Sequence, residues 1–295
     1  MNADPRRRRT RLVVVTATLG LLAVLVGGVA VASRLDLLPG TADEAGAPNG
    51  CDAGCDEDPQ ESSPPEDSST GVPAGTDLVD TEPGTFDEDG LVLDGVTISG
   101  DVLLTGSDQT LRNSRVDGHV IVRGTDVTLE DSELGALSIS GAQGVVASRL
   151  EIFGLLGSDG FHVTSDVGPV RDVVIEDSWV HSPSVTPESH YDGIQVRGVQ
   201  GLEIRGNYFD LGPWEEPYTS AILLQQANGG NSDVLIDGNW IDGGGFALYV
   251  GGADVVVTNN KFGRNANWGL LHGDADPFTE EGNTWADTGE AVTLQ

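Results

Sequence analysis

A short repeated unit constrains the fold of this chain more than any other feature. Beyond about Gly90 the chain returns to an apolar pair, a polar turn of the Asp-Ser or Gly-Asn type, and then an aromatic or apolar residue. An apolar residue shortly before each turn marks eight copies: Leu93, Leu111, Leu129, Ala147, Ile175, Ile204, Ile236 and Val257. The first three intervals are 18 residues and the later ones 21 to 32. A period of this length is typical of solenoids.

The apolar runs inside each copy predict strands. Val120–Val122, Leu137–Ile139 and Ile194–Val196 are short runs whose side chains would alternate in and out, and no sustained helical period follows residue 40. One copy cannot bury its apolar side alone, so neighbouring copies must stack. A leucine-rich repeat would need a helix, and a propeller would need four strands per longer repeat. The sequence therefore predicts an all-β parallel β-helix of about nine rungs over residues 90–295, where a rung is one turn of the solenoid.

Four asparagines recur at one position of the repeat: Asn207, Asn239, Asn260 and Asn283. Each follows a glycine or asparagine, the residue types that tolerate the positive φ of a sharp corner. Asparagine side chains one rung apart can hydrogen-bond to one another. We therefore expect a structural ladder here and not a catalytic group.

The repeat, together with the runs His190–Gly198 and Leu202–Phe209, resembles the right-handed parallel β-helix proteins of the pectate-lyase-like superfamily. This superfamily holds polysaccharide lyases, polygalacturonase-type hydrolases and uronan epimerases, so the resemblance implies a right-handed solenoid and a polysaccharide partner. His190–Gly193 is similar to the Asn-Thr-Asp-Gly phrase of polygalacturonases, with Asp192 at the matching aspartate. Their Gly-His-Gly and Arg-Ile-Lys phrases are missing, which leaves the reaction open.

Three segments precede the repeat. Residues 1–11 are basic and are expected in the cytoplasm, and Leu12–Ser33 is an uncharged run long enough to span a bilayer. This run predicts a single-pass cell-membrane anchor with the C-terminal domain outside; because Ala30–Ala32 resembles a cleavage site, a removed signal segment and secretion stay open. Residues 34–89 are acidic and poor in apolar residues, and are predicted to be a disordered linker.

Charge and cysteine content exclude several classes of function. The chain carries 47 acidic against 15 basic residues and lacks a basic patch or a glycine-rich phosphate loop, so nucleic acid is not an expected partner. Cys51 and Cys55 are the only cysteines, and a local disulfide is the simplest interpretation. The sequence predicts no oligomeric state.

The longest repeats are consecutive, and their extra residues predict loops beside a groove. In a solenoid, insertions map to loops that often line the binding face. The inserted segments are Gly157–Gly168, His181–Tyr191, Leu211–Thr219 and Gln226–Ser232. The alternative is that these loops only decorate the solenoid.

Two Asp-Gly phrases predict a catalytic pair. Asp159-Gly160 and Asp192-Gly193 lie in the same frame on neighbouring rungs, which would place the two carboxylates about one strand spacing apart. Such proximity raises one pKa and suits acid–base catalysis. His190, two residues before Asp192, is a candidate general base. Asp-Gly is also a routine turn dipeptide, so a purely structural role stays open.

Aromatic and hydrogen-bonding side chains around this pair are predicted to bind sugar, because pyranose rings present apolar faces and hydroxyls. The candidates are His162, His181, Gln195, Arg197, Trp214, Tyr218 and Tyr249.

The sequence thus predicts a β-helix protein that binds a neutral or weakly charged polysaccharide, with cleavage as a further hypothesis. Two alternatives stay open: a non-catalytic cell-surface scaffold or adhesion module, and a Ca²⁺-dependent lyase or epimerase. No cofactor is required by the sequence. Asp274 and Asp276 could offer oxygens to Ca²⁺, but two carboxylates make an incomplete site, so a solvated turn is favoured.

Overall fold

The computed structural model describes residues 70–294, and within this range the chain is all-β with no helix. The predicted basic segment, the anchor or signal segment and the linker up to residue 69 lie outside the described residues. Between residues 70 and 294, no helix is long and apolar enough to cross a membrane.

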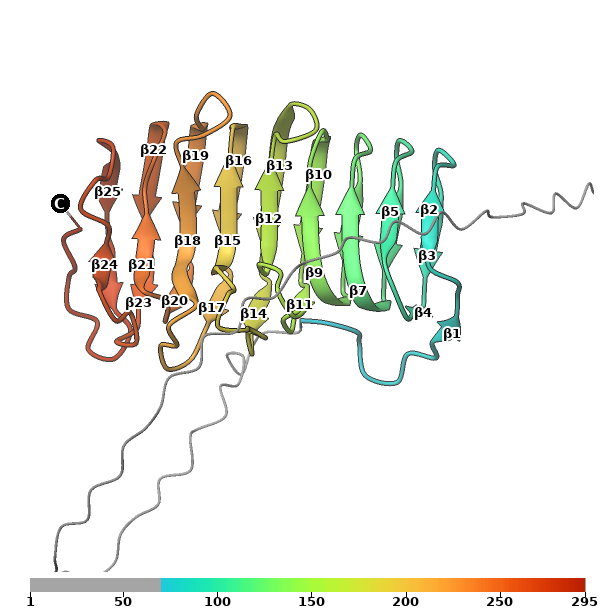
Figure 1. Cartoon of the computed structure of the whole chain (residues 1–295), viewed down its shortest axis with the longest axis horizontal. Helices are drawn as coiled ribbons and strands as arrows, with labels where there is room; N and C mark the ends of the chain where they lie inside the picture. The colour runs from blue at the N-terminus through green and yellow to red at the C-terminus, as the bar shows by residue number, and fades with distance from the viewer. Residues whose placement is uncertain (1–69, 295) are drawn as a thin grey trace, which may run out of the picture. The chain divides into compact units, whose positions relative to one another are not determined.

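The strands form three faces that follow one another around each rung, and all their pairings are parallel. The first face has nine strands, which confirms the predicted solenoid of about nine rungs (Figure 1). Its strands are β3 (Val92–Asp94), β6 (Thr110–Arg112), β8 (Thr128–Glu130), β10 (Gln143–Ser148), β13 (Val170–Glu176), β16 (Val199–Arg205), β19 (Ser232–Asp237), β22 (Ala253–Thr258) and β25 (Thr279–Glu281).

Two long strands, β7 (Arg115–Val122) and β9 (Glu133–Ile139), take part in both other faces. The second face also contains β1 (Val79–Asp80), β4 (Val96–Ile98), β11 (Glu151–Ile152), β14 (Trp179–His181), β17 (Tyr208–Asp210), β20 (Trp240–Asp242), β23 (Lys261–Phe262) and β26 (Thr284–Trp285). The third face also contains β2 (Gly84–Phe86), β5 (Val102–Leu104), β12 (Phe161–Thr164), β15 (Tyr191–Arg197), β18 (Tyr218–Gln225), β21 (Phe246–Tyr249) and β24 (Gly269–Leu271).

The β-helix begins before residue 90, whereas the sequence predicted that the linker extends to residue 89. β1 pairs with β4, and β2 pairs with β5. Val79 and Gly84 donate their backbone N–H groups to the carbonyl oxygens of Gly95 and Asp101. Main-chain pairing depends little on side-chain type, so an acidic, proline-containing composition did not reveal this first rung.

The eight marker residues of the repeat form one stacked column in the core. Leu93, Leu111, Leu129 and the markers that follow are register partners from rung to rung along the first face. All except Leu93 are 0% exposed. The sequence period is therefore the register of the solenoid, and each copy adds one layer to a continuous apolar core.

The predicted asparagine ladder is confirmed. Asn207 donates from Nδ2 to Oδ1 of Asn239 at 3.0 Å, Asn239 to Asn260 at 3.0 Å, and Asn260 to Asn283 at 3.1 Å. In each of these pairs, the same Oδ1 atom also accepts the backbone N–H of the donating asparagine. Positive φ occurs at the preceding residue, as at Gly206 and Asn259. Serines fill this position in earlier rungs: Ser114, Ser132 and Ser178.

The insertions flank the third face on both sides, as the repeat lengths predicted. Loops 153–160, 182–190 and 211–217 lead from the second face into β12, β15 and β18. Loops 165–169 and 226–231 lead from β12 and β18 to the first face. The inserted loops thus frame the centre of one face, where polar side chains gather.

Candidate active site

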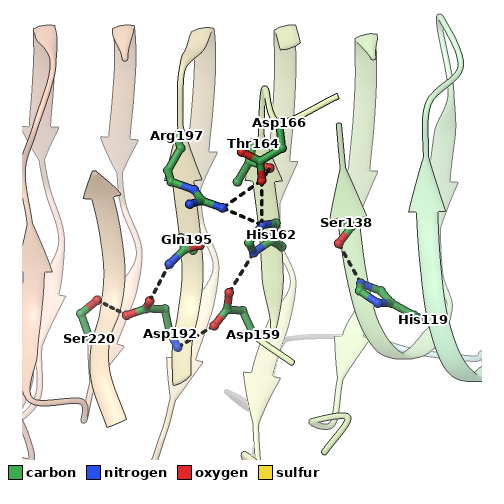
Figure 2. A network of polar contacts seen from close by, with 10 residues as sticks. All are labelled: His119, Ser138, Asp159, His162, Thr164, Asp166, Asp192, Gln195, Arg197 and Ser220. Carbon is green, nitrogen blue, oxygen red and sulfur yellow. Dashed lines mark hydrogen bonds and ion pairs between the residues drawn. The ribbon is translucent and has the colours of Figure 1, made fainter. Parts of the chain in front are cut away.

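A network of polar side chains lies on the third face, across β12, β15 and β18 (Figure 2). The register pairs His162 with Gln195, Thr164 with Arg197, and Asp192 with Ser220. His162, Gln195 and Arg197 point outward because their strand neighbours, such as Phe161 and Val196, are fully buried in the core.

Both Asp-Gly phrases need their glycine for close packing between rungs. A Cβ on Gly160 would lie 2.6 Å from the carbonyl oxygen of Gly193, and a Cβ on Gly193 would lie 2.6 Å from that of Ala221. Such distances exclude a side chain, so glycine is required at both positions. Asp-Gly recurs because the next rung leaves no space for a side chain at the glycine. The close packing of the two glycines places the preceding aspartates on adjacent rungs.

Asp159 fixes the orientation of His162. Its Oδ2 lies 2.9 Å from Nδ1 of His162, and its Oδ1 accepts the backbone N–H of Asp192 at 3.0 Å. The Asp159 side chain is 9% exposed, whereas that of His162 is 29% exposed. With its Nδ1 proton donated to the carboxylate, the imidazole presents its other nitrogen, Nε2, away from Asp159.

A charged pair stands beside this Nε2. Arg197 Nη2 lies 3.4 Å from it and donates to Oδ2 of Asp166 at 2.9 Å. Asp166 also accepts from Asn228 at 2.7 Å and from Thr164 at 2.9 Å. The hydrogen bond from Asn228 lowers the pKa of Asp166 most. The hydrogen bond from Thr164 and the charge of Arg197 act in the same direction, against the effect of burial. The ionised carboxylate therefore holds Arg197 next to His162.

Asp192 is the most perturbed carboxyl group in the network. It is 1% exposed, and its burial, followed by the charge of Asp159, raises its pKa from 3.8 to about 7. Ser220 donates its hydroxyl to Oδ1 at 2.6 Å, and Gln195 Nε2 lies 3.4 Å from Oδ2. Burial raises the pKa because the charged form of the carboxyl group loses its hydration, and a nearby carboxylate raises it further by repelling that charge.

The structure brings Asp159 and Asp192 together on neighbouring rungs, as their shared frame predicted. Both carboxyl groups are largely covered, whereas the side chains of His162 and Asp166 are 29% and 42% exposed. His190 is exposed in loop 182–190, immediately before β15. The network also contains Asp166 and Ser220, which sequence reasoning missed.

Three predicted sugar-binding residues are not part of this network. Tyr218 is 4% exposed and its ring packs in the core against Tyr191, so it offers no face to a sugar. Trp214 is partly buried and donates from Nε1 to the carbonyl oxygen of Tyr218 at 3.2 Å. His181 belongs to the second face, where it stacks on Trp179 and contacts Glu151 at 3.2 Å. Alternation along a strand predicted which side chains point outward, but not to which face a corner residue belongs.

An aromatic cleft lies two rungs from Gln195 on the third face. Tyr249 follows Gln195 and Leu223 in register, and its ring stacks on His272 with centroids 4.0 Å apart. A cavity of ≈ 360 Å³ borders these side chains, lined also by Leu223, Gln225 and Asp274. The outward position of Tyr249 agrees with the alternation predicted along the strands.

Between residues 70 and 294, no set of three or more His, Cys, Asp or Glu side chains is placed to hold an ion. Asp276, one of the two candidate Ca²⁺ ligands, accepts the backbone N–H of Gly252 at 2.9 Å.

Comparison with known proteins identifies the family. A family described as "Right handed beta helix region" matches residues 94–285. The chain belongs to this right-handed β-helix family. No curated protein matches it.

Among solved structures, this family member is similar to the A-module of an Azotobacter vinelandii mannuronan C-5 epimerase, AlgE6, with 18% identity and a TM-score of 0.47 over 65% of this chain and 57% of that one. It is also similar to an alginate lyase from Paenibacillus sp. str. FPU-7, with 15% identity and a TM-score of 0.31 over 72% of this chain and 96% of that one. A tailspike protein of E. coli bacteriophage HK620 has 13% identity and a TM-score of 0.22 over 72% and 55%. The chain spans little more than half of the epimerase module, and these similarities concern the fold.

The perturbed pKa of Asp192 predicts a pH-dependent stability. The unfolded chain ionises this group near pH 4 and the folded chain near pH 7, so its contribution to stability is complete below pH 4 and is lost as the pH rises through 7. Asp192→Asn avoids this loss, which amounts to about 4 kcal/mol at most. We expect the variant to melt above the parent at pH 8, with the difference shrinking at pH 5. Asp254→Asn, at an exposed position of the first face, is the control. A difference that does not change with pH would contradict the assignment.

Proposed function

We propose that this protein binds a polysaccharide along the third face and cleaves it, with His162 as the proton-transfer residue. The observation that carries the proposal is the Asp159–His162 pair, whose partly exposed imidazole stands between a buried carboxyl cluster and the Arg197–Asp166 ion pair. Imidazole is the side chain that gains and loses protons near neutral pH, and a carboxylate on Nδ1 favours the tautomer in which Nε2 exchanges the proton.

The residues of the third face have distinct roles in this proposal. Asp159 is a positioning residue, because it touches His162 and is itself covered. Asp192 supports it by donating its backbone N–H to Asp159. Gln195 and Arg197 offer hydrogen bonds to sugar hydroxyls, and the ring of Tyr249 offers apolar area two rungs away. A linear polymer suits this arrangement because the groups follow one another from rung to rung.

A second candidate function is elimination or epimerisation on an acidic polysaccharide. Arg197 lies 3.4 Å from Nε2 of His162, and a cation beside a base is suited to removing a proton next to a sugar carboxylate. Two observations disfavour this second candidate. Asp166 already neutralises Arg197, and the protein's formal net charge of −32 repels an acidic polysaccharide unless Ca²⁺ bridges the protein and the polymer. Cleavage of a neutral or weakly charged polymer is therefore preferred.

A polysaccharide panel tests the proposal. The purified protein is incubated with neutral and with acidic polysaccharides, in the presence of Ca²⁺ or of a chelator. Reducing ends, unsaturated products and epimerised residues are then measured. Reducing ends without unsaturation are expected. Unsaturated or epimerised products would favour the second candidate. Binding without any product would leave a non-catalytic scaffold or adhesion module.

We also propose that the β-helix is exported and held at the cell membrane by Leu12–Ser33, since this uncharged run follows an arginine cluster. Mass spectrometry of the native protein tests this. An intact N-terminus in the membrane fraction is expected, whereas an N-terminus at Ser33 would exclude the anchor.

A further inference from the structure

A serine and a histidine form a hydrogen-bonded pair on the third face, beside the network around His162. Ser138 Oγ lies 2.8 Å from Nε2 of His119 (Figure 2). Both side chains are half-buried, so solvent reaches them. Ser138 points outward from β9 and is the register partner of His162 on β12, so the serine lies one rung from the proposed proton-transfer residue, and His119 on β7 lies one rung further.

A β-bulge aims His119 at this serine. The register between β7 and β9 shifts between Val116 and His119, which re-orients the side chains that follow. Within the bulge, a Cβ on Gly118 would lie 2.5 Å from the carbonyl oxygen of Gly100, so glycine is required there. Asp101 Oδ1 accepts the backbone N–H of His119 at 2.9 Å and anchors the shifted strand. This bulge lies where β7 passes from the second face to the third, and bulges are over-represented at sheet edges, at barrel rims and beside active sites.

We propose that Ser138 and His119 are the nucleophile and general base of a second activity, the hydrolysis of carboxylic esters. The substrate class is an O-acyl group, such as acetate, on a polysaccharide that lies along the third face. The serine–histidine chemistry is independent of glycosidic-bond cleavage. Only the choice of a polysaccharide as carrier rests on the proposed function.

The two residues can complete a balanced reaction with water. Ser138 Oγ attacks the acyl carbon while its proton moves to Nε2 of His119, and the sugar oxygen leaves with that proton. Water then attacks the acyl-serine, gives a proton to His119, and releases the carboxylic acid as Ser138 regains its proton. Burial lowers the pKa of His119, and nearby His162 acts in the same direction against Asp101 and Asp159. The imidazole is therefore neutral at neutral pH and able to accept the serine proton.

The test uses the full chain, a fluorophosphonate probe and an O-acetylated polysaccharide. We expect mass spectrometry to find the probe on Ser138, and the parent to release acetate. Ser138→Ala should remove the label and lower acetate release by at least ~100-fold, and His119→Gln should lower both by a similar factor. Ser232→Ala, at a half-buried serine on β19 of the first face, should match the parent. Circular dichroism confirms that each variant is folded.

The esterase proposal is overturned if the folded parent is neither labelled nor releases acetate, or if Ser138→Ala retains acetate release. Its failure is distinguishable from that of the proposed function, because glycosidic cleavage is measured separately as reducing ends. Reducing ends without acetate or label would reject the esterase alone. Acetate and labelling without reducing ends would reject glycosidic cleavage alone.

Discussion

Replacing His162 by glutamine is expected to lower kcat of polysaccharide cleavage by ~10²–10⁴-fold, with KM nearly unchanged. Glutamine keeps a hydrogen-bonding group near Asp159 and Arg197 but cannot exchange a proton at neutral pH. Because His162 is half-exposed on the solenoid surface, the substitution leaves the core layers formed by Phe161 and Val163 intact. Melting temperature should therefore change little, which separates the loss of turnover from a loss of folding.

Asp159→Asn provides the companion test of orientation. The amide can present its NH₂ group to Nδ1 of His162, which would favour the wrong tautomer and lower kcat while KM stays near the parent value. His181→Gln is the matched control, because His181 lies on the second face and contacts Glu151 and Trp179. An active His162→Gln variant, or a His181→Gln variant that loses as much turnover, would place the chemistry elsewhere.

Replacing Asn239 by alanine is expected to destabilise the β-helix by about 3–5 kcal/mol. The change removes the oxygen that accepts from both the backbone N–H and Nδ2 of Asn207. It also removes the Nδ2 group that donates to the carbonyl oxygen of Ile204 and to Oδ1 of Asn260. Asn239 is 0% exposed, so water does not replace these partners without opening the corner.

The measurement is chemical unfolding followed by circular dichroism. Asn267→Ala is the control, since Asn267 is exposed, and it should stay within about 0.5 kcal/mol of the parent. Asn239→Ser should recover part of the loss, because serine hydroxyls accept backbone N–H groups at the same position of earlier rungs, as at Ser132 and Ser178. A cost of Asn239→Ala below about 1 kcal/mol would mean that the ladder contributes little to stability.

The repeat spacing was enough to predict the fold, because each copy adds one layer of inward side chains. The eight marker residues turned out to be register partners, and the position of Gln195 beside His162 followed from the same frame. Burial at corners could not be predicted in this way. Tyr218 begins β18 but turns into the core against Tyr191, since alternation does not apply where the backbone changes face.

The sequence predicted that Asp159 and Asp192 lie close together, but it gave His162 only a sugar-binding role and did not reveal Asp166 or Ser220. Asp159 and Asp192 were recognisable because they precede glycines in equivalent frames. Asp166 lies in a loop of polar residues and becomes part of the network only through the ion pair with Arg197 and the hydrogen bond from Asn228 of a distant loop. Contacts of this kind join residues far apart in sequence, and no local sequence pattern predicts them. The same holds for Ser138 and His119, which a β-bulge brings together.

The central claim is that a polysaccharide lies along the third face with a glycosidic bond next to His162. The most direct measurement is the crystal structure of the His162→Gln variant in complex with an oligosaccharide that the parent binds. The claim predicts sugar rings over β12 to β21, with hydroxyls hydrogen-bonded to Gln195 and Arg197 and one ring against Tyr249. An oligosaccharide bound to the first or second face, with the third face empty, would contradict it.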